Sequence, residues 1–202
     1  QDLAYYNAET NPTSNEGEIL YLWTPDPAGI YNQVQYPSAD SISSNYAKGY
    51  LTSQLMTLIY ANEKLFNQKL ASMDDMWLVE SLALLASAYY AGEDYTSKHL
   101  GQFLTSRPQY ISLTEDLSKE FVDDQYMAMT ADEQYGLRTL FGWYLHTSLC
   151  PGASVAPCAK LKNVITAKTL GIKTVEGVLG NDFDKVLENF GMTVGVSLTD
   201  HP

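Results

Sequence analysis

The 202-residue sequence has few basic residues and no long apolar run. Lys and Arg total 12 against 24 Asp and Glu, which gives a formal net charge of -12. This charge repels the phosphate backbone of nucleic acids and the surface of anionic lipids, so we expect neither as a partner. No stretch reaches the roughly 20 apolar residues that cross a bilayer, so we expect no membrane-spanning segment.

Motifs of several common enzyme classes are missing as well. The chain contains no GxSxG nucleophile elbow, no phosphate-binding P-loop and no GxGxxG dinucleotide fingerprint. Neighbouring carboxylates such as Asp74 and Asp75 fall at expected helix starts, where acidic side chains complement the helix dipole. We therefore expect no cofactor.

Cysteine is scarce, with Cys150 and Cys158 alone in the segment SLCPGASVAPCAK. Pro and Gly break helical structure around this short loop, so the two are expected to form a local disulfide, which contributes about 2–3 kcal/mol at most. Disulfides persist in oxidising compartments, and the pair therefore predicts an extracytoplasmic protein. The alternative is two reduced thiols in a cytosolic protein. A closed zinc site requires four ligands, and no CxxC or nearby His supplies the others.

The residues that are present have the composition of a globular domain. Hydrophobic residues make up 45% and charged residues 18%, which is apolar enough for a continuous core and unlike a disordered chain. We expect one domain over residues 1–202, with a strand and loop arm over 1–45 and a helical core over 46–202. The strand is expected at 18–23, where EILYLW precedes a Pro-rich turn. The fold class is thus mainly α with a small β element.

The first helical pattern begins near Asn45. Five side chains recur at spacings of four and three residues and so share one helix face: Leu51, Leu55, Leu58, Asn62 and Leu65. The pattern predicts a helix that ends at about Leu70.

Capping signals indicate the helices that follow. An apolar stretch after Asp75 predicts a buried helix that Gly92 ends. Thr130 and Glu133 have the spacing of a capping box, at the start of a long aromatic helix that ends at Cys150. Further helices are expected over residues 95–104, 112–123, 164–170, 175–179 and 182–192, followed by a loose, polar C-terminus.

Glu80 is the only charged residue between Asp75 and Glu93, within the helix that is expected to be buried. A buried carboxylate requires compensation by a metal ion, a proton or hydrogen-bond donors. Glu80 is therefore a metal ligand, a general acid or base with a raised pKa, or a carboxylate satisfied by a Tyr hydroxyl or an Asn amide of the core.

Two segments around Glu80 resemble those of a peptidase family. DMWLVESL at residues 75–82 is similar to the W-L-N-E-G-L/F segment of gluzincin metallopeptidases. LIYANEKLFNQK at residues 58–69 is similar to H-E-F-Q-H-x-I-N-F-N-Q-K of bacterial hyicolysin-type peptidases. Similar pieces follow in the same order, so the resemblance covers about residues 18–192. It implies the helical part of a zincin-like (gluzincin) domain, with Glu80 in the place of the third zinc ligand.

The resemblance also implies that the HExxH motif has been lost. Leu58 and Asn62 stand at its two zinc-binding histidines, and Ile59 stands at its general base. Leu has no lone pair, Ile takes no proton, and a neutral Asn amide is a poor zinc ligand. We therefore expect no catalytic residue and no metal site.

The histidines offer few replacements for the lost ligands. His99 lies in a polar stretch and is expected on the solvated surface. His146 lies in the aromatic helix and is expected to interact with the dipole at its C-terminal end. The alternative function is a metal-dependent hydrolase with a site rebuilt around Glu80 and His146.

The expected function is that of a catalytically inactive metallopeptidase homologue in a bacterial cell envelope or secreted from the cell. Its ligand would be a protein, peptide or glycan, bound at the former active-site cleft or at nearby aromatic residues. Tyr and Trp provide large contact areas at low entropic cost. The candidate residues are Leu58, Ile59, Asn62 and Glu80 of the cleft, with Tyr31, Tyr36 and His146 as further ligand contacts. A structural helical domain of a larger surface protein is the third hypothesis.

Overall fold

The computed structural model describes residues 44–73, 75–92, 94–106, 112–114, 129–152 and 158–199, with the backbone alone for Asp94 and residues 196–199. The chain divides into two compact units, residues 1–43 and residues 44–202, and the description covers parts of the second unit only. The strand expected at residues 18–23 and the candidate contacts Tyr31 and Tyr36 lie outside the described residues.

The described part of the chain is helical and contains no strand. Its elements are α2 (Asn45–Ala61), the π-helical turn η2 (Asn62–Asn67), α3 (Met76–Ala91), α4 (Asp94–Ser106), α5 (Ala131–Leu149), α6 (Ala159–Thr166), α7 (Gly171–Leu179) and α8 (Phe183–Thr199). The expectation of a mainly α fold is confirmed for this part. Among these helices, none combines the length and apolar character that crossing a membrane requires.

Local capping signals correctly located two of the central helices. At the start of α5, the Thr130 hydroxyl accepts a hydrogen bond from Glu133 N at 3.3 Å, and the Glu133 carboxylate accepts one from Thr130 N. This is the expected capping box. Gly92 ends α3 with a φ of 77°, a conformation that residues with a Cβ rarely adopt.

The last three helices differ from the sequence prediction. α6 and α7 begin several residues earlier than expected. The prediction missed these starts because the N-cap residues Cys158 and Leu170 make no side-chain capping bond. α8 continues to Thr199 where a loose C-terminus was expected, and Phe190 and Val194 continue its apolar face. Residues 112–114 are not helical, and the rest of the helix expected over 112–123 lies outside the described residues.

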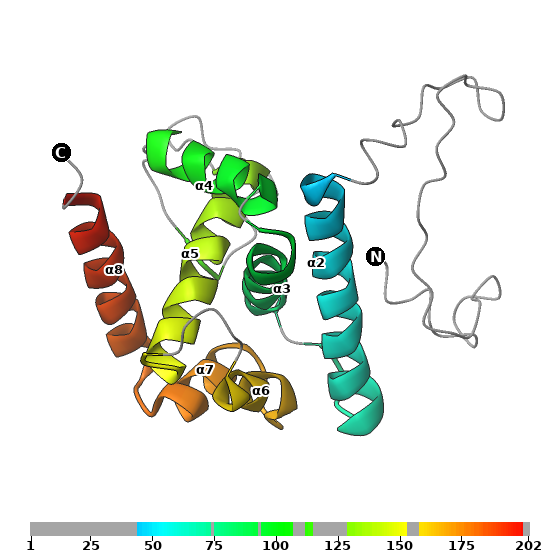
Figure 1. The fold of residues 1–202 in the computed structure, drawn as a ribbon. Helices are drawn as coiled ribbons and strands as arrows, with labels where there is room; N and C mark the ends of the chain where they lie inside the picture. The colour runs from blue at the N-terminus through cyan, green and yellow to red at the C-terminus, as the bar shows by residue number, and fades with distance from the viewer. Residues whose placement is uncertain are drawn as a thin grey trace, which may run out of the picture. The chain divides into compact units, whose positions relative to one another are not determined.

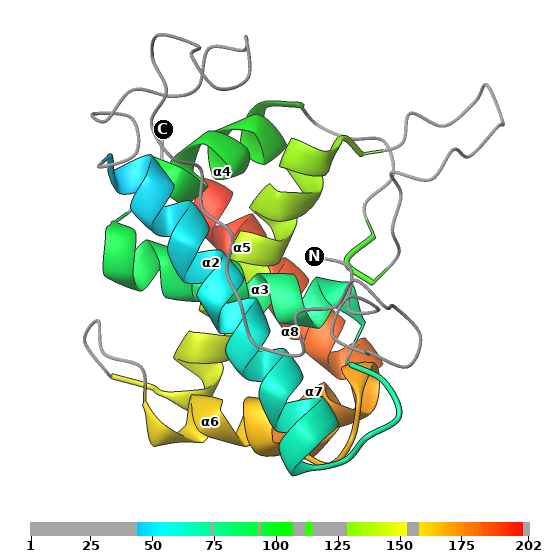
Figure 2. The same ribbon diagram turned by 90° about the vertical axis from the view of Figure 1, so that its right-hand side faces the viewer.

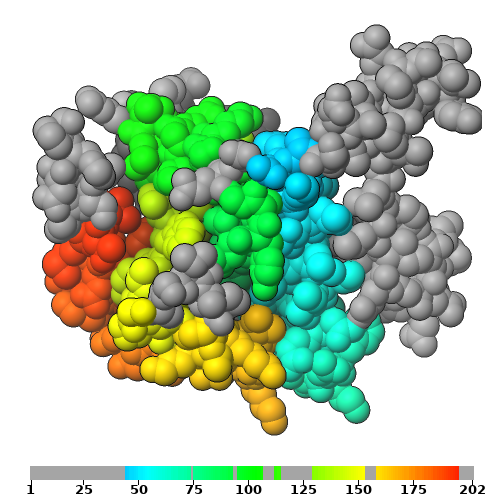
Figure 3. All heavy atoms as spheres, viewed as in Figure 1, coloured from blue at the N-terminus to red at the C-terminus, as the bar shows by residue number. Residues whose placement is uncertain are grey.

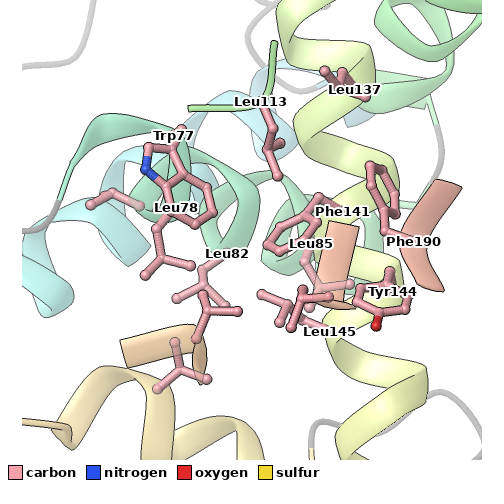
Figure 4. Packing of buried hydrophobic residues seen from close by; sticks show 14 of the residues in the cluster. Trp77, Leu78, Leu82, Leu85, Leu113, Leu137, Phe141, Tyr144, Leu145 and Phe190 are labelled. Atoms are coloured by element: carbon pink, nitrogen blue, oxygen red, sulfur yellow. The ribbon is translucent and has the colours of Figure 1, made fainter. Parts of the chain in front are cut away.

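The core of this unit forms around α5. Figure 1 shows α5 between α3 and α8, with α4 across one end and α6 and α7 near the other. Phe141 of α5 packs between the neighbouring helices, with its ring centroid 5.6 Å from that of Trp77 in α3 and 5.2 Å from that of Phe190 in α8 (Figure 4). Most residues of α3 are buried in this core, as the sequence predicted.

The leucine-rich face of α2 is not its buried face. α2 packs against α3, which it crosses in the view of Figure 2, and against α4. Its buried residues are Gly49, Ser53, Tyr60 and Ala61. Three of these are small, which lets the helices approach closely. Leu55 and Ile59 are exposed instead, so α2 presents a partly exposed apolar face to its surroundings.

Candidate functional site

The three positions of the lost peptidase motif lie on the last turn of α2. The Asn62 N–H donates to the carbonyl oxygens of Leu58 and Ile59, so helical geometry continues through Asn62. Leu58 and Asn62 are therefore one turn apart on the same face of the helix. Both are half-buried, and Ile59 is 49% exposed. These positions thus lie at the accessible side of α2 and carry no side chain that binds zinc well or accepts a proton.

Glu80 of α3 forms an ion pair with Arg138 of α5. The Arg138 Nη1 group donates to Glu80 Oε2, and the two side chains are 7% and 20% exposed, respectively. Each charge compensates the other in a region with little access to water. The apolar sequence around this carboxylate predicts a neutral donor, a proton or a metal as its partner, so the pairing with Arg138 was missed.

A signal for Arg138 was present in the sequence. It is the only Lys or Arg between Lys119 and Lys160, just as Glu80 is the only charged residue of its helix. Two isolated opposite charges on two apolar helices favour a pairing, because neither is stable alone in the core. The separation of 58 residues between them hid this pairing from local analysis.

Tyr135 lies one turn before Arg138 on α5 and interacts with the ion pair. Burial raises the pKa of its hydroxyl, and the Glu80 charge raises that pKa further, whereas Arg138 opposes the effect. The hydroxyl is therefore protonated at neutral pH and is available as a hydrogen-bond donor. Asp132 and Tyr50 also raise this pKa, so groups from α2, α3 and α5 interact here.

His99 is buried, and the expectation of a solvated surface histidine was wrong. Its side chain is packed between the rings of Tyr95 and Tyr135, and the residue is 5% exposed. Its Nδ1 lies 2.7 Å from Asp132 Oδ1. Burial acts to raise the pKa of Asp132, but hydrogen bonds from His99 and Lys98 hold it below its usual value. The packing of α4 on α5 therefore overrides the polar local sequence.

Two exposed tyrosines of α2 pack against Tyr95, which itself packs on this buried histidine. Tyr46 and Tyr50 are 48% and 51% exposed, and their rings meet the edge of Tyr95 at centroid distances of 5.0 and 6.5 Å. Burial raises the pKa of Tyr95 to about 12, so its hydroxyl stays neutral. We name Tyr46, Tyr50 and Tyr95 the tyrosine surface. The aromatic ligand contacts predicted from the sequence are Tyr31 and Tyr36, and these three residues were not among them.

His146 lies in a different part of α5. It is 3% exposed and packs against the rings of Tyr89 and Trp143, at centroid distances of 5.3 and 6.2 Å. Because Arg138 and His146 are eight residues apart, they are separated by about 12 Å along α5. The structure therefore does not bring His146 to Glu80, as the rebuilt hydrolase site would require. Within the described ranges, no group of three or more His, Cys, Asp or Glu residues could hold a metal ion.

Cys150 and Cys158 form the disulfide that the sequence predicted. Their Cα atoms are 6.0 Å apart, and the bond joins the end of α5 to the start of α6.

The chain matches no family model, no curated protein and no solved structure.

Proposed function

We propose that this chain is a degenerate gluzincin-type peptidase domain that binds a protein, peptide or glycan without cleaving it. The ion pair between Glu80 and Arg138 carries the proposal. A carboxylate that binds zinc must direct its oxygens at the metal ion, whereas here the Glu80 carboxylate accepts a hydrogen bond from the Arg138 guanidinium. The positive charge of Arg138 also opposes a divalent cation at the same place.

Surface features of α2 support a binding role. The tyrosine surface exposes Tyr46 and Tyr50, and the opposite end of α2 exposes Ile59 next to the half-buried Leu58. Exposed aromatic and apolar side chains grouped on one element are typical of interaction sites. The buried pair of His99 and Asp132 supports the tyrosine surface from behind, because His99 packs on Tyr95.

The disulfide supports an extracytoplasmic location. Such bonds are rare in the reducing cytosol and persist in the periplasm, at the cell surface and in secreted proteins. An envelope or secreted binding domain agrees with the Cys150–Cys158 bond and with the acidic net charge, which disfavours nucleic acid partners.

Metal content and proteolysis test the loss of catalysis. The protein purified without chelator should contain less than stoichiometric zinc and should not cleave unfolded casein when zinc is added. Cleavage that a chelator abolishes, and that Glu80→Gln also abolishes, would contradict the proposal.

Restoring the motif tests the gluzincin geometry itself. The triple variant Leu58→His, Ile59→Glu, Asn62→His should bind about one zinc ion per chain, because the two new imidazoles lie one turn apart on α2. The substituted side chains are exposed or half-buried, so the helical fold should persist. Adding Arg138→Gln should strengthen zinc binding by releasing the Glu80 carboxylate. The control adds Glu80→Gln to the triple variant and should lose the metal. A folded variant that binds no zinc, even with Arg138→Gln, would contradict the family assignment.

The binding role can be tested with glycan and peptide arrays. Ligands retained by the wild-type protein should be lost by the double variant Tyr46→Ala, Tyr50→Ala. The matched control is Met192→Ala, which removes another exposed large apolar side chain, on α8. A ligand that both variants bind as well as the wild-type protein would contradict a role for the tyrosine surface.

A further inference from the structure

A concave surface lies between α2, α3 and α6. It is a pocket of about 360 Å³ with apolar walls, formed by Met56 of α2, Leu82 and Leu85 of α3, and Leu161 and Ile165 of α6. Figure 3 shows these three helices meeting on one face of the molecule. The described residues that line the pocket do not include Leu58, Ile59 or Asn62 of the lost peptidase motif.

A hydrogen-bonding group in the pocket wall has no partner. Tyr89 lines the pocket, and its hydroxyl oxygen is buried and makes no hydrogen bond in the described structure. Burial raises the pKa of Tyr89, so the hydroxyl is neutral and can donate a hydrogen bond. Behind Tyr89, the buried Nε2 of His146 also has no partner. Buried polar groups without partners are uncommon in proteins and favour a site that a ligand completes.

The described part of the pocket lining carries a positive charge. Among the described residues that line the pocket, Lys162 is the one with a charged side chain, and Lys162 is exposed. Glu63 attracts Lys162 electrostatically. The Glu63 carboxylate oxygens already accept hydrogen bonds from Asn67 at 2.7 Å and Gln68 at 3.0 Å. Among the described residues, the Lys162 ammonium group forms no ion pair, so it can attract an anion.

We infer that this pocket binds a small amphipathic carboxylic acid. A cavity of about 150 Å³ lined by Leu, Ile and Phe accepts benzene, so a volume of about 360 Å³ accommodates two fused rings or a medium-length alkyl chain. The apolar part would lie between α3 and α6. The carboxylate would accept a hydrogen bond from the Tyr89 hydroxyl and face Lys162. Apolar walls with a few polar groups are typical of small-molecule sites. The inference does not depend on the proposed function.

Calorimetric titration with 2-naphthoate and with the neutral analogue 2-naphthalenemethanol tests this inference. The wild-type protein should bind the acid at least tenfold more tightly than the alcohol. Tyr89→Phe removes only the hydroxyl and should weaken naphthoate binding about tenfold, the effect of one hydrogen bond to a charged group. Lys162→Met should weaken it several-fold. The matched control is Lys160→Met, an exposed lysine on the same helix that does not line the pocket, and it should bind like the wild-type protein.

Stability measurements separate lost binding from lost folding. Without ligand, Tyr89→Phe should be at least as stable to heat as the wild-type protein, because it removes a buried hydroxyl that has no partner. Three results would each overturn the inference: no binding of naphthoate at millimolar concentration, equal affinity for acid and alcohol, or wild-type affinity in both Tyr89→Phe and Lys162→Met.

Discussion

Removing the Glu80 carboxylate should destabilise the protein through the charge that it leaves behind. The Arg138 side chain is 7% exposed, so in Glu80→Ala the guanidinium would stay buried and lose its ion pair with Glu80. Removing one partner of a buried ion pair typically costs about 3–5 kcal/mol, against about 0–1 kcal/mol for exposed pairs. Because Glu80 is 20% exposed and water can partly replace its carboxylate, we expect a loss of about 3 kcal/mol, at the lower end of the buried range.

Two further variants distinguish charge from packing. Glu80→Gln keeps an oxygen that can accept from Arg138 and loses only the charge, so it should cost about 1–2 kcal/mol. The double variant Glu80→Leu, Arg138→Met removes both charges and should be more stable than Glu80→Ala, because apolar replacements of a buried pair are often neutral. The control is Glu188→Ala, which breaks an exposed pair with Lys185 at 2.7 Å and should cost less than about 0.5 kcal/mol.

Urea and thermal unfolding at neutral pH, followed by far-UV circular dichroism, measure these differences. For a chain of this size, 1 kcal/mol corresponds to about 2–4 °C in Tm, so Glu80→Ala should lower Tm by about 6–12 °C. A Glu80→Ala variant within about 0.5 kcal/mol of the wild-type protein would refute the reasoning. So would a double variant that is less stable than Glu80→Ala.

Three other perturbations have defined outcomes. Gly136→Ala should cost about 1–3 kcal/mol in urea unfolding, because its new Cβ would overlap the His99 carbonyl oxygen, while Gly177→Ala, with open space around it, should be neutral or stabilising. Asp132→Asn should be less stable than the wild-type protein at pH 7. The pKa of Asp132 is lowered in the folded state, so the stability difference between the two proteins should have its full size above about pH 4. It should disappear as the pH falls through that lowered pKa. A series of Tm values measured at different pH would show this loss. Reducing the disulfide should lower stability by about 2–3 kcal/mol, and an unchanged Tm after reduction would contradict its role.

The helices were predictable where their signals are local. The capping box of Thr130 and Glu133, and the stop at Gly92, involve residues a few positions apart, so periodicity and capping suffice to place α3 and α5. The starts of α6 and α7 were misplaced because Cys158 and Leu170 carry no capping signal. The face that α2 buries was also misjudged. Small residues such as Gly49 pack against its neighbours, and leucine spacing alone does not show which face another helix will cover.

The sequence by itself determined the mainly helical character of the described residues, the disulfide, and the isolation of Glu80 among apolar neighbours. These properties depend on residue type and short spacings. The tertiary structure alone decided that Arg138 pairs with Glu80, that His99 is buried against Asp132, and that His146 lies away from both. Such pairings depend on which helix faces meet in the core, and distant segments meet only when the whole unit has packed.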